Sequence, residues 1–241
     1  VDRVVVKRLV ERIEPNAGPA ASPRGADRRA MGLVGQYDFR GAAGPAVSDS
    51  SGMAPAMDLA IGNPELAKCL ASGLQVRGAA DVALGGELPK IRQGWAKNRG
   101  MTMELFIRPA LNSAGTPAGR RKLACVVAGD GATAWFYDGG DGRLPEDKSF
   151  HLVFVSDDTS GRFVQHFYKD GARLASVPAS PQPFGLNRRP GNINIILAPS
   201  RSDGTPAQEA WQGELVYMAL YDRPLQMDEV SQLTQSGVPA K

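Results

Sequence analysis

From Met31 onward, short apolar runs alternate with turn-forming residues along the chain. In residues 102–108 (TMELFIR), Met103, Leu105 and Ile107 occupy every second position, which places their side chains on one face of a β-strand. Similar runs, bounded by Gly, Asp, Asn and Ser, predict strands over residues 32–39, 74–76, 102–108, 122–127, 132–137, 149–155, 162–168, 172–177, 192–197 and 213–221. Many short strands separated by turns are typical of a β-sandwich or a β-barrel.

One helix is predicted, close to the C-terminal end. Met227, Val230 and Leu233 form an apolar stripe at helical spacing, and Gly237 stands where a left-handed C-terminal cap is expected. Residues 87–100 are polar around Trp95 and fit either a loop or a short helix.

The first 30 residues differ from the rest of the chain in charge. They hold seven Lys/Arg and four Asp/Glu, whereas the other residues hold 21 of each kind, so the net charge of +3 comes from this segment. We therefore divide the chain into a basic N-terminal arm and linker, residues 1–30, and one β-sandwich domain, residues 31–241. Because the body is neutral, nucleic acid is not expected as a partner. The candidate partner-binding residues of the arm are Arg3, Lys7, Arg8 and Arg12.

The sequence also bears on location and on cysteine chemistry. No apolar run reaches the roughly 18 residues that span a membrane. The chain begins with Val, which leaves room for a signal or anchor segment before Val1 and for membrane association through that segment or through a partner. Cys69 and Cys125 have two interpretations, a pair of buried thiols or one disulfide that closes a long loop.

Four segments, in order, resemble one family. Residues 32–52 run as an aromatic strand, a Gly-rich turn and Asp-Ser-Ser-Gly, and residues 102–109 alternate around a Glu and close with Arg-Pro. Residues 167–171 (FYKDG) end a hairpin, and residues 211–225 (WQGELVYMALYDRPL) hold a Trp-x-Gly strand and a Tyr-Asp-Arg-x-Leu corner. Together they resemble bacterial laminin-G-like, concanavalin A-like domains. The resemblance implies an all-β, two-sheet antiparallel jelly-roll sandwich with a short C-terminal helix, and carbohydrate or protein binding as the usual activity.

Patterns of catalytic residues are missing from the sequence. Related glucanases carry a Glu-x-Asp-x-x-Glu strand, whose alternation brings the carboxylates onto one sheet face. Here Glu104 stands alone and Phe106 occupies the place of the Asp, so we interpret Glu104 as a structural carboxylate. Neither a Gly-x-Ser-x-Gly elbow nor a Gly-rich phosphate loop ahead of a helix occurs. We predict no catalytic residue and no enzyme activity.

The two histidines are candidate ligand-binding residues. If residues 149–155 and 162–168 form a hairpin in the symmetric register, His151 lies opposite His166, with Cβ atoms about 5 Å apart. Two imidazoles could share one ion, but a stable transition-metal site needs about three or four ligands, and the sequence offers no third. The preferred interpretation is a half-exposed pair on the sheet face opposite Phe150, and no metal site is predicted.

Tryptophans are the other candidates for ligand contact. Exposed aromatic rings stack on sugars in sugar-binding sandwiches. Trp95, in polar surroundings, is the candidate platform, with a buried loop anchor as the alternative, and Trp135 lies in a strand with its face undecided. Trp211, in the Trp-x-Gly strand, is expected in the core.

Calcium is the one cofactor weighed, and none is expected to be essential. Calcium needs about six to eight oxygen ligands, and no dense run of acids occurs in the sequence. The loop acids that could contribute are Asp138, Asp141, Asp157, Asp158 and Asp170.

These observations predict a non-catalytic extracytoplasmic module that binds a carbohydrate or a protein ligand. The basic arm and the aromatic content of 7% favour an alternative, a structural accessory subunit of a larger periplasmic or membrane-bound complex, docked through the arm. A glycoside hydrolase or lyase is a third alternative, which the missing carboxylate pattern disfavours.

Overall fold

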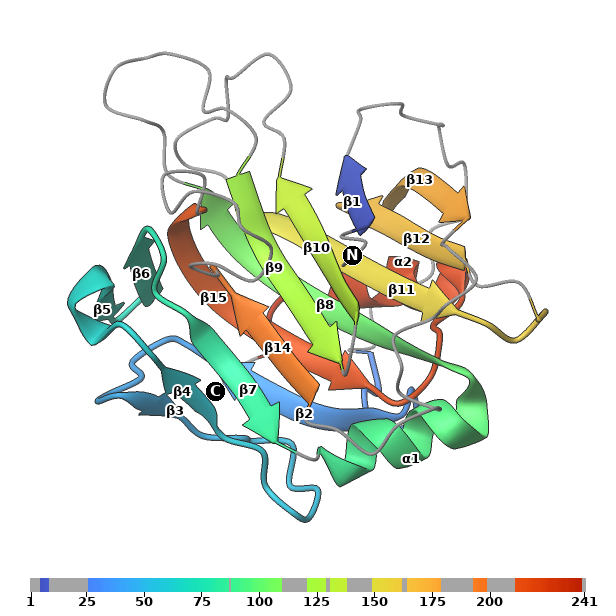
Figure 1. The fold of residues 1–241 in the computed structure, drawn as a ribbon, viewed down its shortest axis with the longest axis horizontal. Helices are drawn as coiled ribbons and strands as arrows, with labels where there is room; N and C mark the ends of the chain where they lie inside the picture. The colour runs from blue at the N-terminus through green and yellow to red at the C-terminus, as the bar shows by residue number, and fades with distance from the viewer. Residues whose placement is uncertain are drawn as a thin grey trace.

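The protein is a β-sandwich, as the alternation of apolar residues predicts (Figure 1). The computed structural model describes residues 5–8, 26–86, 88–109, 121–128, 131–137, 149–161, 164–178, 193–198 and 211–239. Within these ranges the strands pair antiparallel in two sheets, except that β1 is parallel to β10.

Sheet A has seven strands in the described residues. Across the sheet they are β1 (Val5–Arg8), β10 (Gly131–Tyr137), β9 (Arg121–Ala128), β14 (Ile193–Leu197), β7 (Val82–Gly86), β4 (Leu59–Ile61) and β3 (Ala46–Val47). The strand β1 belongs to the predicted arm, so part of the arm pairs with a sheet of its own chain.

Sheet B has eight strands in the described residues. Across the sheet they are β13 (Ala172–Pro178), β12 (Val164–Lys169), β11 (Phe150–Asp157), β8 (Gly100–Pro109), β15 (Gln212–Tyr221), β6 (Gly73–Arg77) and β5 (Ala67–Leu70). The eighth, β2 (Leu33–Asp38), pairs with β15.

In the part of the chain that the structure describes, two α-helices accompany the sheets, besides the short 3₁₀ helix η1 (Pro64–Leu66). The helix α2 (Met227–Ser236) matches the prediction, and the amide of Gly237 caps it by donating to the carbonyl of Leu233 at 3.1 Å. The helix α1 (Pro89–Asn98) resolves the choice left open for residues 87–100, and it begins at a proline, whose missing N–H costs nothing in a first turn. Among the described residues, no helix is long and apolar enough to cross a membrane.

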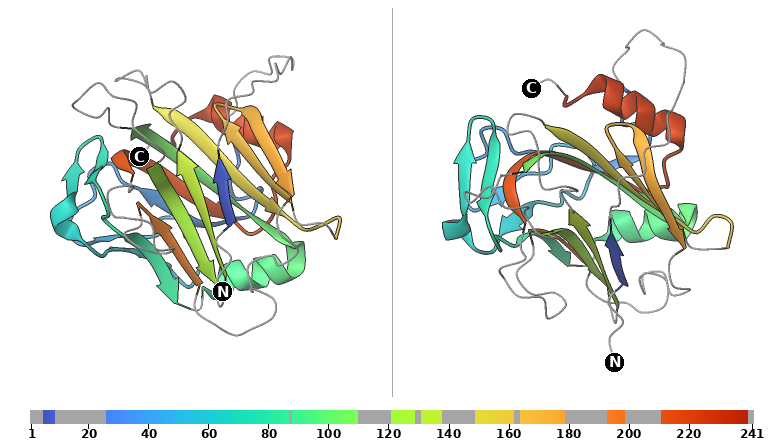
Figure 2. Two further views of the ribbon diagram at one scale, coloured as in Figure 1. Left: turned by 45° about the horizontal axis from the view of Figure 1, so that its top comes forward. Right: turned by 90° about the horizontal axis from the view of Figure 1, so that it is seen from above.

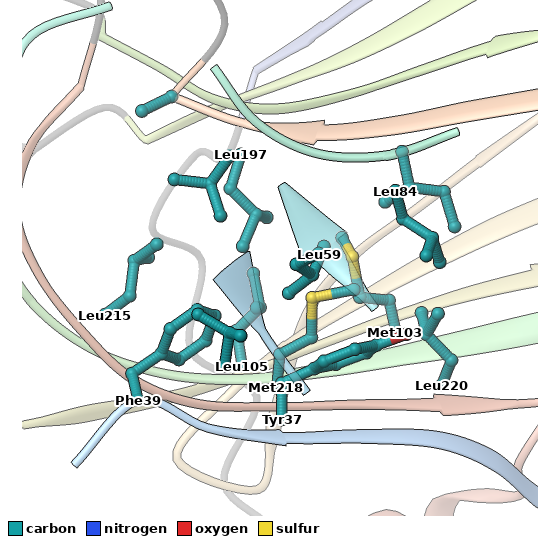
Figure 3. Close-up of a cluster of buried hydrophobic side chains, with 14 of the residues drawn as sticks. Tyr37, Phe39, Leu59, Leu84, Met103, Leu105, Leu197, Leu215, Met218 and Leu220 are labelled. Atoms are coloured by element: carbon teal, nitrogen blue, oxygen red, sulfur yellow. The ribbon is translucent and has the colours of Figure 1, made fainter. Parts of the chain in front are cut away.

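The main core fills the space between the two sheets (Figure 3). Leu59, Leu84 and Leu197 reach it from sheet A, and Met103 and Leu105 reach it from sheet B. These side chains have almost no solvent exposure, and burying each one contributes about 1.5–3 kcal/mol.

A second apolar cluster lies on the other face of sheet B. In the right-hand view of Figure 2, α2 and sheet A lie on opposite sides of sheet B. This cluster contains Val153 and Val155 of β11 together with Val230 and Leu233 of α2. Because both faces of sheet B are covered, nearly every residue of β8 is buried, including those that alternation predicts to face water.

Candidate functional site

The pairing of the strands brings several polar side chains together on the outer face of sheet B, which α2 covers. Asp38 lies opposite Tyr217, Tyr217 lies opposite Phe106, and Phe106 lies opposite His151, so the four residues form one row across β2, β15, β8 and β11. Glu104 lies in the next row of the same face, because side chains on a strand alternate with a period of two. Residues far apart in the sequence therefore surround one carboxylate.

The Glu104 carboxylate is fully buried and receives hydrogen bonds on both oxygens. Arg28 donates from Nη2 to Oε1 at 2.9 Å and from Nε to Oε2 at 3.2 Å, which is the bidentate geometry of strong ion pairs. The Tyr221 hydroxyl donates to Oε2 at 2.5 Å, and His151 Nε2 lies 3.2 Å from Oε1. We call Arg28, Glu104, His151 and Tyr221 the Glu104 cluster.

The cluster connects the two terminal segments of the domain. Arg28 also donates to the carbonyl of Gly237 at 2.9 Å, and His151 Nδ1 lies 2.7 Å from the Thr234 hydroxyl on α2. Nearby, the amide of Ala26 donates to the Ser236 hydroxyl at 2.7 Å. The segment that precedes β2 is thus bound to the helix that ends the domain.

Stacking fixes two of these side chains. The imidazole of His151 stacks on the ring of Phe106, with ring centroids 4.3 Å apart, and the guanidinium of Arg28 lies 5.5 Å from the ring centroid of Tyr217. Tyr217 itself contacts Phe106 edge-on at 6.1 Å between centroids. These two side chains are therefore held in place by packing as well as by hydrogen bonds.

The electrostatics of the cluster favour the ionised form of the Glu104 carboxylate. Burial alone would raise the pKa of Glu104, but hydrogen bonds from His151 and Arg28 hold that pKa below its ordinary value of 4.5. Burial and the negative charge of Glu104 raise the pKa of Tyr221, so this hydroxyl keeps its proton and donates it. Both oxygens of Glu104 already accept hydrogen bonds, and the side chain has no exposed surface, so it is out of reach of a substrate. In this structure Glu104 holds neighbouring segments together.

The structure separates the two histidines that the symmetric register pairs. Val155, not His151, lies opposite His166, which is a shift of four residues. An even shift keeps both imidazoles on the outer face but places them about 13 Å apart along the strands. His151 is 97% covered and belongs to the Glu104 cluster, whereas His166 is half-buried. The predicted half-exposed pair is wrong because the pairing of β11 with β12 extends to Asp157 and Val164, two residues further along each strand than the symmetric register places its end.

The platform predicted for Trp95 is wrong as well. Trp95 lies on α1 with no exposed surface, inside the main core, so it has the alternative role of an anchor. Trp211 is buried as expected. Trp135 lies on β10, and its side chain is outside the described residues.

The remaining candidates are not brought together. Cys69 is a free, half-buried thiol on β5, so the disulfide alternative is not realised there, and the side chain of Cys125 is outside the described residues. The side chains of Arg3, Lys7, Arg8 and Arg12, and also Asp138 and Asp141, are outside them too.

Three of the loop acids weighed as calcium ligands have contacts within the fold. Asp157 accepts hydrogen bonds from Thr159, Asp158 pairs with Arg99, and Asp170 accepts the amide of His151 at 2.9 Å. In the described part of the chain, no three His, Cys, Asp or Glu side chains lie close enough to hold a metal ion.

Sequence reasoning missed three residues of this site. Arg28 was grouped with the other bases of the arm, and Tyr217 and Tyr221 were grouped with the apolar residues of the closing strand. One signal was available: a single carboxylate in a strand of apolar residues requires a buried cationic partner. The partner lies 76 residues away in the sequence, and no spacing rule identifies it.

The fold is similar to parts of solved structures. Neither a protein-family model nor a curated protein matches the sequence. The sialidase of Trypanosoma rangeli in complex with 2,3-difluoro-KDN is 20% identical, with a TM-score of 0.59, over 85% of this chain and 32% of the sialidase. The same sialidase in complex with sialic acid is 18% identical, with a TM-score of 0.59, over 95% of this chain and 36% of the sialidase.

The chain therefore shares a β-sandwich fold with a part of these sialidases and spans about a third of their length. This similarity contradicts the predicted function. The sequence predicted a non-catalytic extracytoplasmic binding module, or an accessory subunit docked through the arm, whereas the solved structures that the chain resembles are glycoside hydrolases.

Proposed function

We propose that this chain takes part in glycoside hydrolysis, as the β-sandwich part of a glycan-hydrolysing protein. The observation that supports the proposal is the match of 85–95% of the chain to about a third of a sialidase. A sandwich of this size is a complete structural unit with its own core, so it corresponds to a domain of such an enzyme.

The Glu104 cluster supports a structural role for the described residues within that protein. Glycoside hydrolases place their catalytic side chains in contact with the sugar. Glu104 and Tyr221 are 0% and 1% exposed, and the two carboxylate oxygens and the tyrosine hydroxyl are engaged with each other and with Arg28. We propose that the catalytic groups lie outside this cluster and that the cluster stabilises the sandwich.

Two finer assignments belong to the same proposal. Membership of the laminin-G-like group is supported by the closing strand, where Gly213 has a φ of +155° and a Cβ there would lie 2.5 Å from the carbonyl of Arg108 and from the ring of Trp211. The Trp-x-Gly pattern therefore has a steric cause in this chain. A periplasmic or extracellular location agrees with a role in processing glycans.

The test is an activity measurement on the protein as the native cell makes it. The protein, tagged at its chromosomal locus and isolated intact, is incubated with a panel of 4-methylumbelliferyl glycosides that includes the sialoside. We expect hydrolysis of at least one glycoside well above the blank. An intact isolate that is inert toward the whole panel would overturn the proposal.

A variant tests the structural role of the cluster separately. We expect Glu104→Gln to lower thermal stability but to leave kcat per folded molecule within about twofold of the parent. Removing a general acid would instead lower kcat by about 10²–10⁴-fold. Such a loss, at a temperature where the variant is fully folded, would show that Glu104 is catalytic.

A further inference from the structure

Two arginines hold the C-terminal tail of the domain by its main chain. We use "the tail" for residues 237–239. Arg28 Nη2 donates to the carbonyl of Gly237 at 2.9 Å, and Arg40 Nη2 donates to the carbonyl of Pro239 at 2.6 Å. Between these two contacts, Val238 packs against the apolar cluster beneath α2. The tail is thus bound as a peptide ligand is bound, by two carbonyls and one apolar side chain.

Each arginine is held in position by its own carboxylate. Arg28 pairs bidentately with Glu104, and Arg40 pairs bidentately with Asp38 at 2.8 Å for both bonds. In each pair the carboxylate neutralises the positive charge of the arginine. The N–H that donates to the tail is therefore a donor in a fixed position that carries no net positive charge with it. Such donors suit uncharged carbonyl oxygens and do not favour a phosphate or a carboxylate.

A third polar group, the hydroxyl of Tyr217, lies in the same place. Tyr217 lies opposite Asp38 in the sheet, and its ring is covered by Arg28. The side chain is 0% exposed, and its hydroxyl finds no hydrogen-bond partner in the described part of the chain. Its neighbours Asp38 and Arg28 belong to the Asp38–Arg40 pair and the Glu104–Arg28 pair, so Tyr217 lies beside both pairs. A buried hydroxyl without a partner is costly, so the tail is an incomplete match for this site.

We propose that Arg28, Arg40 and Tyr217 form a binding site for an uncharged peptide main chain of a partner protein, and that the tail is its built-in occupant. A competing segment that offers carbonyls to both arginines and a further carbonyl to Tyr217 makes three polar contacts, where the tail makes two. The tail has the advantage of being part of the same chain, which keeps the site closed until such a segment is present at high local concentration. Such binding would be independent of any glycoside hydrolysis.

The experiment measures binding of a peptide to the full-length chain. The probe is the peptide SGVPAK, residues 236–241, carrying fluorescein on its lysine, and its fluorescence anisotropy is followed as protein is added. The variant Val238→Asp releases the tail by removing its apolar contact and leaves the three binding residues intact. We expect this variant to bind the probe at least tenfold more tightly than the parent, in which the tail competes.

Two further variants make the result specific. In the Val238→Asp background, Arg40→Gln is expected to weaken binding at least tenfold, while Arg77→Gln, which changes an exposed arginine on β6, leaves it unchanged. Absence of binding at 1 mM, or binding that is indifferent to Arg40→Gln, would overturn the proposal. Should Val238→Asp fail to fold, Val238→Ala replaces it, and folding is verified for each variant by circular dichroism and melting temperature.

Discussion

Changing Glu104 to glutamine measures how much unfolding free energy is lost when the buried ion pair with Arg28 is broken. The substitution keeps the shape of the side chain but removes its charge and turns one acceptor into a donor, which then faces Arg28, Tyr221 or His151. Arg28, only 9% exposed, keeps its charge without a counter-ion. Breaking a buried pair by removing one partner costs about 3–5 kcal/mol. For a chain of this size, about 3 kcal/mol lowers the melting temperature by about 6–12 °C.

The assay is thermal unfolding of parent and variant at pH 7, with a second ion pair of sheet B as the matched control. Glu214 accepts from Arg108 at 3.1 Å, but this arginine is 36% exposed, so the pair is screened by water. Glu214→Gln is therefore expected to cost less than about 1 kcal/mol. The reasoning is wrong if the Glu104→Gln variant melts within about 2 °C of the parent, or if the two variants are equally destabilised.

The pH dependence of the same variant provides an independent measurement. The pKa of Glu104 is lower in the folded protein than its ordinary value of 4.5, so the carboxylate stabilises the fold fully above that value. The stabilisation is lost as the pH falls through the folded pKa, because the folded protein must then bind a proton. We expect the difference in unfolding free energy between parent and Glu104→Gln to be largest near neutral pH and to shrink in acid, and a difference that grows in acid would contradict this sign.

Three further substitutions test neighbouring parts of the structure. Tyr221→Phe removes the donor that lies 2.5 Å from Glu104, so we expect a loss of about 1–2 kcal/mol and an acid-unfolding midpoint at higher pH, measured by circular dichroism. Gly94→Ala is expected to destabilise in urea titration although alanine favours helices by about 1 kcal/mol, because its Cβ would lie 2.3 Å from the Cβ of Asp222. Trp95→Ala is expected to cost about 3–5 kcal/mol by calorimetry, and a fully stable variant would show that the ring is not a core anchor.

The fold was accessible from the sequence because it depends on local periodicity. The alternation of Met103, Leu105 and Ile107 predicted a strand, and burial of every second residue against a second sheet follows from it. The helix α2 was equally predictable, since its apolar stripe and its glycine cap lie within one short segment. Where the signal was weaker, as in the polar residues around Trp95, the sequence left the choice between loop and helix open.

The site was decided by tertiary structure alone. Glu104 is recognisable in the sequence as a lone carboxylate, but its partners come from the arm, from β11 and from β15, and only packing and strand register bring them together. Register is also what separated His151 from His166, because pairing that ends two residues further along each strand moves one strand past the other by four residues without changing its pattern. The sequence by itself determined which strand residues face the opposite sheet, since that follows from the two-residue period of a strand. Which residues lie opposite one another depends on strand register, and which residues cover the outer face of sheet B depends on how the terminal segments pack there; both are properties of the whole folded chain.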